Sequence, residues 1–319
     1  MSLLQEREYY KPFNYPWAFE HYKTQQHMHW LPDEVNLADD LRDYRDKLTS
    51  GNKKLISQIF RFFTQADVDV CCGYAKHYLP TFKQPEVRMM LSAFAAMEAV
   101  HQEAYSLLLE TLGFGDEEYK KFFEHKEMLA KHEHLNNFGM KSEMDIAKTM
   151  AIYSAFTEGV QLFSSFAILL NFPRHNLMKG MGQIVTWSVR DETLHVEGMS
   201  QLFRTFIKEN PDLWTDDLKY EIYCAAERTV ELEDAFIDLC FENAEVPNLT
   251  AAEIKDYIRY IADRRLLGLG MKKIFGSESN PLPWLDYMLN GVEHTNFFEN
   301  RATEYSRAST TGNWQDIFK

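Results

Sequence analysis

Two Glu-x-x-His pairs occur in this sequence, each within a long stretch of helical pattern. They are Glu98-Ala99-Val100-His101 and Glu192-Thr193-Leu194-His195. Residues i and i+3 share one face of an α-helix, so each pair directs a carboxylate and an imidazole toward the same point. A single pair at this spacing is common by chance, whereas the repeated pair indicates a metal site built from two similar halves.

A carboxylate precedes each pair by about thirty residues, and in the first half the choice lies between Asp67 and Asp69. Apolar residues recur at helical spacing on the face of Asp67: Phe63, Val70 and Tyr74. Asp69 points elsewhere on the same helix. A carboxylate on a buried face needs a cation, because an unpaired charge taken out of water is strongly unfavourable. The pattern therefore favours Asp67.

Glu158 is the corresponding residue of the second half. It lies near the middle of an apolar stretch, and its own helical face carries Ala155, Leu162 and Phe166. A protonated glutamate that is hydrogen-bonded within the core is the alternative interpretation. The two Glu-x-x-His pairs favour a metal ligand instead.

The candidate ligands combine hard oxygen donors with imidazole. They are four carboxylates and two histidines: Asp67, Glu98, His101, Glu158, Glu192 and His195. These donors suit iron or manganese, and the absence of thiolates at the motif spacings argues against structural zinc. Four carboxylates can balance the charge of two divalent ions. The sequence therefore predicts a dinuclear metal centre, with di-iron favoured and dimanganese or a mixed pair as alternatives.

The composition argues against several classes of function. The chain of 319 residues has a formal net charge of -14 and no basic run, which disfavours nucleic acid or an anionic membrane as partner. An apolar signal segment is missing from the N-terminus and the four cysteines form no regular framework, so a reducing cytoplasm is the expected location. The apolar stretch 150–172 is long enough to cross a bilayer, but Glu158 within it favours the central helix of a soluble protein.

Apolar residues recur at intervals of three and four from about residue 37 to 275, and no stretch alternates as a strand would. This pattern predicts helices over 53–79, 86–112, 117–137, 143–171, 177–208, 214–244 and 251–274. The expected fold is an all-α, ferritin-like bundle of long helices with the dinuclear site in its core. We expect an N-terminal segment over 1–35, one helical domain over 36–300 and a flexible tail over 301–319.

The six candidate ligands, with Arg190-Asp191 directly before Glu192, resemble those of the small (β) subunit of class I ribonucleotide reductase. The resemblance covers essentially the whole chain and includes RRLLG at 264–268, NPLPW at 280–284 and NFFE at 296–299. It implies that a dinuclear centre activates oxygen and leaves a stable radical on a tyrosine. A separate large subunit then uses this radical to reduce ribonucleotides to deoxyribonucleotides.

The resemblance also implies roles for individual residues. In the family a tyrosine follows the first histidine by one helical turn, and Tyr105 has that position. Trp30 and Asp191 match the tryptophan and aspartate that carry the oxidising equivalent from the metal site, and Tyr305 matches the tyrosine that passes it to the large subunit. Ser188 departs from the family pattern, which more often has an aliphatic or aromatic residue, and this puts the lifetime of the radical in doubt.

The end of the chain predicts a partner. From about residue 301 the helical pattern gives way to Ser, Thr, Gly and Asn, and the chain ends in WQDIFK at 314–319. A polar tether with an aromatic tip is typical of a docking peptide, and in the family the last residues bind the large subunit. A homodimer is also expected, because the helices carry more apolar surface than one bundle buries.

Two other functions are compatible with a dinuclear helix bundle. An oxidase or monooxygenase would act on a small apolar substrate at the metal site, and would need a cavity there but no docking tail. A ferritin-like iron store would need neither Trp30 nor Tyr305 and usually has a much shorter chain. Tyr105 and the tail favour the radical-generating subunit over both.

Overall fold

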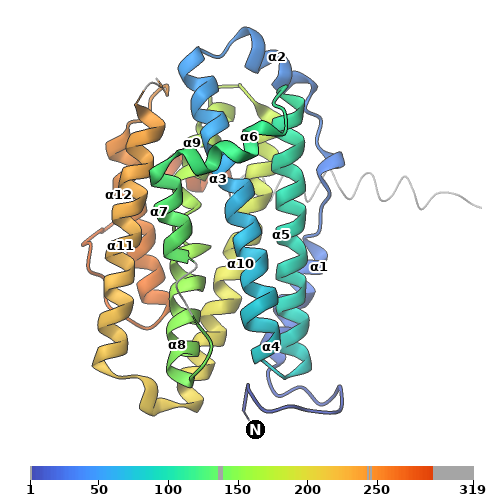
Figure 1. The fold of residues 1–319 in the computed structure, drawn as a ribbon, viewed down its shortest axis with the longest axis vertical. Coiled ribbons are helices and arrows are strands. Elements are labelled where there is room, and N and C mark those ends of the chain that lie inside the picture. Colours follow the sequence, from blue (N-terminus) through green and yellow to red (C-terminus); the bar gives the residue numbers. More distant parts are fainter. Residues whose placement is uncertain (1, 136–138, 243, 245, 290–319) are drawn as a thin grey trace, which may run out of the picture. The chain divides into compact units, whose positions relative to one another are not determined.

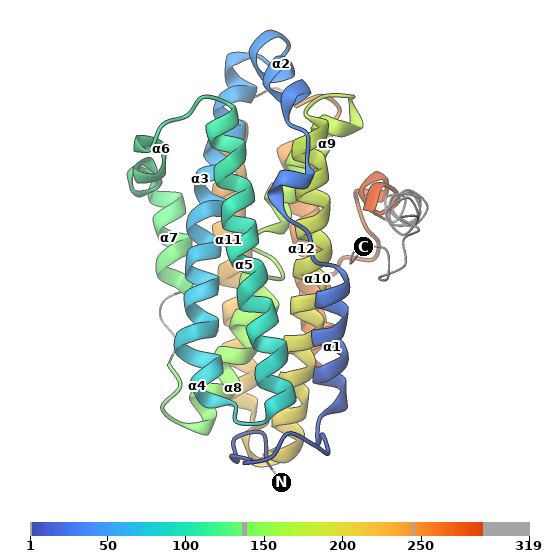
Figure 2. The same ribbon diagram turned by 90° about the vertical axis from the view of Figure 1, so that its right-hand side faces the viewer.

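The computed structural model describes residues 2–135, 139–242, 244 and 246–289, and these residues form helices and turns without a β-strand. They fall into two compact units, of which the first extends from Met1 to Pro281 and the second begins at Leu282. All helices discussed below belong to the first unit. Its long helices run roughly along one common direction in both Figure 1 and Figure 2.

The helices follow one another with mostly short connections, as the periodicity predicts. Their bounds are α1 Pro16–His27, α2 Ala38–Asp46, α3 Ser50–Gly73, α4 Leu79–Thr81, α5 Pro85–Thr111, α6 Glu117–Lys120, α7 Lys126–Leu135, α8 Glu143–Ile152, α9 Phe163–Arg174, α10 Lys179–Glu209, α11 Asp216–Phe241 and α12 Ala251–Gly268. A π-helical segment, Tyr74–Tyr78, joins α3 to α4. Within this unit α3 packs on α5, and α10 packs on α5, α8 and α9.

The predicted helix over 143–171 is interrupted. After α8 the backbone forms a second π-helical segment, Tyr153–Thr157, and residues 158–162 form turns before α9 begins. The amide of Glu158 bonds the carbonyl of Tyr153 at 3.4 Å, and the amide of Gln161 bonds that of Phe156 at 3.1 Å. Both bonds reach back five residues, the pattern of a π-bulge, which is frequent at functional sites.

Two other predicted helices differ in extent. The helix expected over 117–137 is divided into α6, a 3₁₀ segment at Lys121–Glu124, and α7. The helix expected over 251–274 ends earlier, at Gly268, because Gly270 adopts a left-handed conformation with φ of +81°. The amide of Met271 then turns back to the carbonyl of Leu266 at 2.9 Å, the usual way in which a glycine ends a helix.

The long apolar stretch lies in the core of the bundle. Every residue from 150 to 172 is buried. Among the described residues, none of the helices combines the length and the apolar character that crossing a membrane requires. Packing against neighbouring helices therefore accounts for the hydropathy of this stretch.

Carboxylates of α2 hold the N-terminus of α10. Asp40 accepts hydrogen bonds from the backbone amides of Gly180 and Met181 at 2.9 and 2.8 Å, and Asp43 accepts one from that of Met178 at 3.0 Å. The first amides of a helix have no partner inside it, and negative charge there complements the helix dipole. This contact anchors the helix that carries the second Glu-x-x-His pair.

Candidate metal centre

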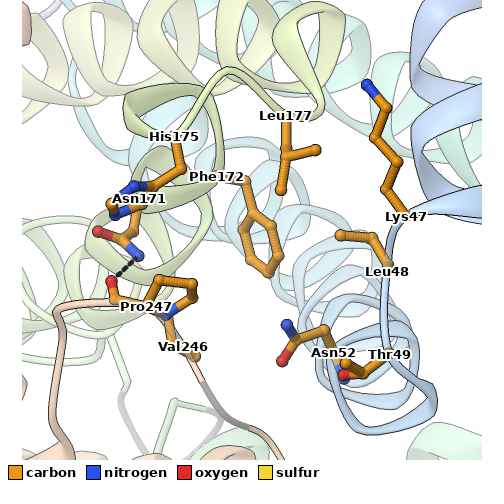
Figure 3. A pocket seen from close by; sticks show the side chains of 10 residues that line it. All are labelled: Lys47, Leu48, Thr49, Asn52, Asn171, Phe172, His175, Leu177, Val246 and Pro247. Carbon is orange, nitrogen blue, oxygen red and sulfur yellow. Dashed lines mark hydrogen bonds between the residues drawn. The ribbon is translucent and has the colours of Figure 1, made fainter.

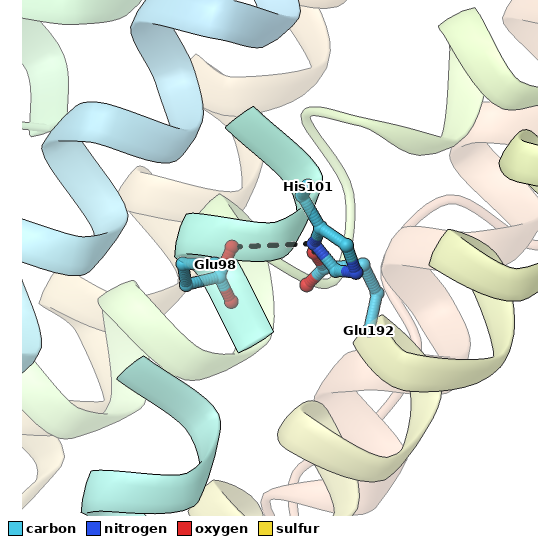
Figure 4. A group of neighbouring side chains, drawn as sticks. All are labelled: Glu98, His101 and Glu192. Carbon is cyan, nitrogen blue, oxygen red and sulfur yellow. Dashed lines mark ion pairs between the residues drawn. The ribbon is translucent and has the colours of Figure 1, made fainter. Parts of the chain in front are cut away.

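The two Glu-x-x-His pairs face each other from α5 and α10. His101 Nδ1 lies 3.5 Å from the Glu98 carboxylate and 3.3 Å from that of Glu192. His195 Nδ1 lies 2.9 and 3.7 Å from the same two carboxylates. Each glutamate therefore lies near both histidines, so the two Glu-x-x-His pairs form one cluster. Figure 4 shows Glu98 and His101 turned toward Glu192 on the opposite helix.

The side chains form two overlapping groups with metal-binding geometry. One group is Glu98, His101 and Glu192, and the other is Glu98, Glu158 and His195; within each group the donor atoms lie within 4.8 Å of one another. Glu98 is common to both groups. Glu158 enters from the interrupted segment after the π-helix, so four separate stretches of chain meet here once Asp67 of α3 is included.

Asp67 and Asp69 have different surroundings. Asp67 is 1% exposed, and burial followed by the negative charge of Glu98 raises its pKa well above the usual value. Asp69 instead contacts the imidazole of His132, which is a partly buried residue. Asp69 thus has a partner on α7, whereas Asp67 belongs to the carboxylate cluster.

The cluster lacks hydrogen-bond partners for many of its atoms. All six candidate ligands are at most 1% exposed. Eight of their side-chain atoms have no hydrogen bond: Asp67 Oδ2, both oxygens of Glu98, His101 Nδ1, both oxygens of Glu158, Glu192 Oε2 and His195 Nδ1. Buried polar atoms are nearly always paired in folded proteins, because each unpaired one costs about 1–3 kcal/mol. Two divalent cations fit this cluster in both charge and donor type.

Hydrogen bonds on the far side of each imidazole orient its free nitrogen toward the cluster. His101 Nε2 lies 3.3 Å from Asp191 Oδ2, and His195 Nε2 lies 3.0 Å from the side-chain oxygen of Gln25. An acceptor at Nε2 places the ring proton there and leaves the Nδ1 lone pair for a metal ion. Gln25 lies in a polar run of α1 that carries no motif, so sequence reasoning misses it.

Trp30 lies against the outer side of the site. Its indole N–H donates to Asp191 Oδ2 at 2.7 Å, and its ring stacks on His101 with centroids 6.0 Å apart. Asp191 therefore contacts Trp30 and His101 through the same oxygen. Burial opposes the charge of Asp191, but the hydrogen bonds to His101 and Trp30 and the positive charge of Arg190 together outweigh it and lower the pKa of this carboxyl.

Tyr105 lies one turn beyond His101, and the centroids of the two rings are 6.4 Å apart. It is 2% exposed, with the rings of Phe63 and Phe60 at 4.8 and 5.8 Å. Burial raises the pKa of Tyr105 well above its usual value, although a hydrogen bond with Ser188 acts in the opposite direction. Ser188, the residue that departs from the family pattern, thus contacts the phenol itself.

A second buried tyrosine adjoins the other histidine. The Tyr74 ring lies 6.4 Å from that of His195, and its hydroxyl has no hydrogen-bond partner. Burial and then the charge of Glu158 raise the pKa of Tyr74 well above its usual value. The apolar stripe on α3 predicts a buried position for this residue but not its proximity to the cluster.

Four cavities of the described residues, of about 290 to 590 Å³, are lined by none of the six candidate ligands. Figure 3 shows one of about 350 Å³, between the start of α3 at Asn52 and the end of α9 at Asn171 and Phe172. Asn171 donates a hydrogen bond to the carbonyl of Pro247 at its edge, at 2.9 Å. These cavities do not supply the substrate pocket that an oxidase needs at the metal site.

Comparison with known proteins decides the family. The family described as "Ribonucleotide reductase, small chain" matches residues 7–281. The chain belongs to this family of ribonucleotide reductase small subunits. A probable ribonucleoside-diphosphate reductase small subunit of Invertebrate iridescent virus 6 is 44% identical, with 100% of this chain and 99% of the viral protein covered.

Two solved structures show the same ferritin-like, all-helical fold. Dimanganese(II)-NrdF of Streptococcus sanguinis has a TM-score of 0.74 at 22% identity, over 86% of this chain and 96% of that one. The ribonucleotide reductase Rnr4 homodimer of Saccharomyces cerevisiae has a TM-score of 0.75 at 18% identity, over 87% of each chain. As a ribonucleotide reductase small subunit, the chain is an oxidoreductase component that acts with a large subunit.

Protons and metal ions compete for the candidate ligand side chains of this small subunit. Interactions with the surrounding carboxylates together outweigh burial and raise the pKa of His195 to about 10 and that of His101 well above its usual value. Burial raises the pKa of Asp67 and Glu158. A ligand binds a cation in its deprotonated form, so a raised pKa in these groups weakens metal binding as the pH falls.

Metal affinity is therefore expected to rise with pH. Each proton displaced contributes about a tenfold increase in apparent affinity per pH unit. Calorimetric titration of the metal-free chain with Mn²⁺ between pH 6 and 8, in two buffers of different ionisation enthalpy, measures both the affinity and the protons released. Binding without proton release and without pH dependence would contradict the assigned protonation states.

Proposed function

We propose that Asp67, Glu98, His101, Glu158, Glu192 and His195 hold two iron or manganese ions, and that this small subunit stores a radical on Tyr105. The observation that carries the proposal is the pair of imidazoles whose Nδ1 atoms face shared, unpaired carboxylates. When bound, the two ions would supply the activation of oxygen and the one-electron oxidation of a nearby phenol.

The surroundings of Tyr105 suit a stored radical. The phenol gives up an electron and its hydroxyl proton and becomes a neutral phenoxyl. Phe60 and Phe63 pack against the ring, and the side chain is almost entirely screened from solvent. This packing keeps water and soluble thiols, which would quench the radical, away from the ring. The hydrogen bond between Ser188 and the hydroxyl influences how readily the phenol is oxidised.

Export of the oxidising equivalent is proposed to follow the contacts from His101 through Asp191 to Trp30. The 2.7 Å hydrogen bond between the indole and Asp191 supports this route, because it lets a proton move as the tryptophan loses an electron. Tyr305 is proposed as the next carrier, toward the large subunit. It lies outside the residues that the structure describes.

Iron and manganese both suit the donor set. We propose di-iron as the first candidate, and the dimanganese(II) content of the Streptococcus sanguinis protein supports dimanganese as the alternative. We further propose a cytoplasmic location, which the four free cysteines support. The proposed organisation is a Trp30-bearing segment over 1–35, the helical domain over 36–300 and the docking tail over 301–319.

Reconstitution tests the proposal. Metal-free protein is loaded with Fe(II) and exposed to oxygen, and its iron content and electron paramagnetic resonance spectrum are measured. We expect two irons per chain and the spectrum of a tyrosyl radical. Two bound irons without a radical would point first to a manganese-dependent small subunit and then to an oxidase that acts on a substrate. Fewer than two metal ions per chain would refute the dinuclear centre.

The tail is proposed to bind the large subunit. These residues lie outside the part of the chain that the structure describes. Deletion of residues 314–319 is expected to abolish that association, because an aromatic tip on a polar segment is typical of a docking peptide. Size-exclusion chromatography with light scattering measures the complex, and it also tests the homodimer that the Rnr4 structure supports. The truncated chain should keep both metal ions. Undiminished binding of the truncated chain would exclude the tail as the docking element.

A further inference from the structure

A buried ion pair that the proposed function does not use lies beside the interrupted segment 158–162. Lys131 of α7 pairs with Glu233 of α11, and both side chains are 0% exposed. The ammonium also lies 3.7 Å from the centroid of the Phe62 ring and 4.2 Å from that of Phe236. Replacement of such a pair by apolar residues of similar volume is often neutral or stabilising, so stability alone does not explain it.

Lys131 binds the backbone of the interrupted segment. Its Nζ donates a hydrogen bond to the carbonyl of Gln161 at 3.0 Å. Its partner Glu233 accepts a hydrogen bond from the hydroxyl of Ser164, in the first turn of α9. The ion pair therefore contacts the chain on both sides of the point where helix resumes after Glu158.

A second cation binds the same segment from another helix. Arg265 of α12 donates from Nε to the carbonyl of Gly159 at 2.9 Å, and its guanidinium lies 4.8 Å from the centroid of the Phe163 ring. A Cβ at residue 159 would lie only 2.9 Å from Arg265 Nε and 2.2 Å from the carbonyl oxygen of Ala155. Glycine therefore permits the close approach of the arginine to the backbone.

These contacts replace the hydrogen bonds that a continuous helix would supply. Where helical bonding fails, carbonyl groups need other donors, and donors that carry a charge form the stronger hydrogen bonds. The carbonyls of Gly159 and Gln161 lie one and three residues after Glu158, whose carboxylate faces Glu98 and His195. The position of this backbone determines where the Glu158 carboxylate lies.

We infer that Lys131 and Arg265 are positioning residues for Glu158, an inference that rests on the proposed dinuclear centre. Arg265 holds the carbonyl of Gly159 and Lys131 holds that of Gln161. The two contacts fix the position of the Glu158 carboxylate, which completes the second half of the site for a divalent cation. The first half needs no such support, because Glu98 and His101 lie within the uninterrupted helix α5.

The test is titration of the metal-free full chain with Mn²⁺, followed by calorimetry and electron paramagnetic resonance. Wild-type chain should bind two ions. Lys131→Met should lower the affinity for the second ion by about 10- to 100-fold, the usual effect of losing a residue that supports a ligand, and leave the first unchanged. The spectrum of isolated Mn²⁺ should then appear at two equivalents. Lys131→Arg, which keeps a cationic donor, should restore part of the affinity.

Arg7→Met is the matched control. Arg7 also forms a buried ion pair, with Glu86, and also donates to a backbone carbonyl, that of Tyr10 at 3.1 Å. Its loss should leave both affinities unchanged. Equal loss at both metal positions in Lys131→Met, or an equal effect of Arg7→Met, would overturn the inference. If Lys131→Met does not fold, Arg265→Lys replaces it, since this variant keeps the charge but displaces the donor from Gly159.

Hydrogen exchange of the metal-free chain separates this inference from the proposed function. Lys131→Met and Arg265→Lys should speed exchange in peptides that cover 153–166 and leave the other helices at wild-type rates. Unchanged exchange there would overturn the inference even if two ions bind. A wild-type chain that binds fewer than two Mn²⁺ would refute the dinuclear centre, whereas the exchange result would still report whether the two cations hold the segment.

Discussion

Tyr105→Phe is expected to eliminate the tyrosyl radical. Reductase activity with the large subunit should then fall by at least about 1,000-fold, because the other residues of the radical route cannot act without the residue that stores the radical. Phenylalanine fills the same space among Phe60 and Phe63 but has no hydroxyl proton to lose. The two metal ions should remain bound, because Tyr105 is not one of the candidate ligands. Metal analysis and the electron paramagnetic resonance spectrum after loading with Fe(II) and oxygen measure both outcomes.

Tyr78→Phe provides the control for this variant. Tyr78 is also buried, but its hydroxyl contacts the carbonyl of Thr149 rather than the site, at 3.4 Å. The control should keep the radical signal. A radical of wild-type intensity in Tyr105→Phe would mean that another side chain carries it, and the Tyr74→Phe and Tyr105→Phe double variant would then show whether the phenol beside His195 does so.

Trp30→Phe is expected to separate storage of the radical from its use. The variant keeps an aromatic ring on His101 but loses the indole N–H that bonds Asp191. We expect the Tyr105 radical to form, while activity with the large subunit falls by at least about 100-fold, within the range that loss of a positioned proton carrier causes. Radical content by electron paramagnetic resonance and turnover with the large subunit are measured on one preparation.

Trp187→Phe is the comparison for Trp30→Phe. The Trp187 ring lies 5.1 Å from that of Trp30, so it shares the same aromatic contact. The indole of Trp30, however, is the one that donates to Asp191. Trp187→Phe should therefore stay close to wild-type turnover. Equal losses in both variants would indicate that packing in this region, rather than the hydrogen bond to Asp191, controls activity.

Much of the candidate site could be predicted because its residues are local in sequence. Glu98 and His101 lie one turn apart on α5, so helical geometry alone brings their side chains together. The same holds for Glu192 and His195 on α10. Periodicity likewise gives the long helices, and the comparisons confirm the family and the all-α fold. The assignment of the six side chains as metal ligands stays a prediction until metal is bound.

The features that sequence reasoning misses depend on contacts between distant segments. Neither a proline nor a pair of glycines marks the break at 158–162 in the sequence. The carbonyls of Gln161 and Gly159 accept hydrogen bonds from Lys131 and Arg265 of two other helices. An apolar periodicity that continues through the break predicts one helix instead. Gln25 is a similar case, because its place beside His195 arises only when α1 packs against α10.

Gln25 also constrains the order in which the protein is assembled. Its amide donates to Asp191 at 3.3 Å while its oxygen bonds His195, so one helix completes the surroundings of side chains that lie 166 and 170 residues further along the chain. Contacts between residues this far apart in sequence form slowly, because a long loop must close first. The surroundings of both imidazoles are therefore expected to be among the last parts of the bundle to form.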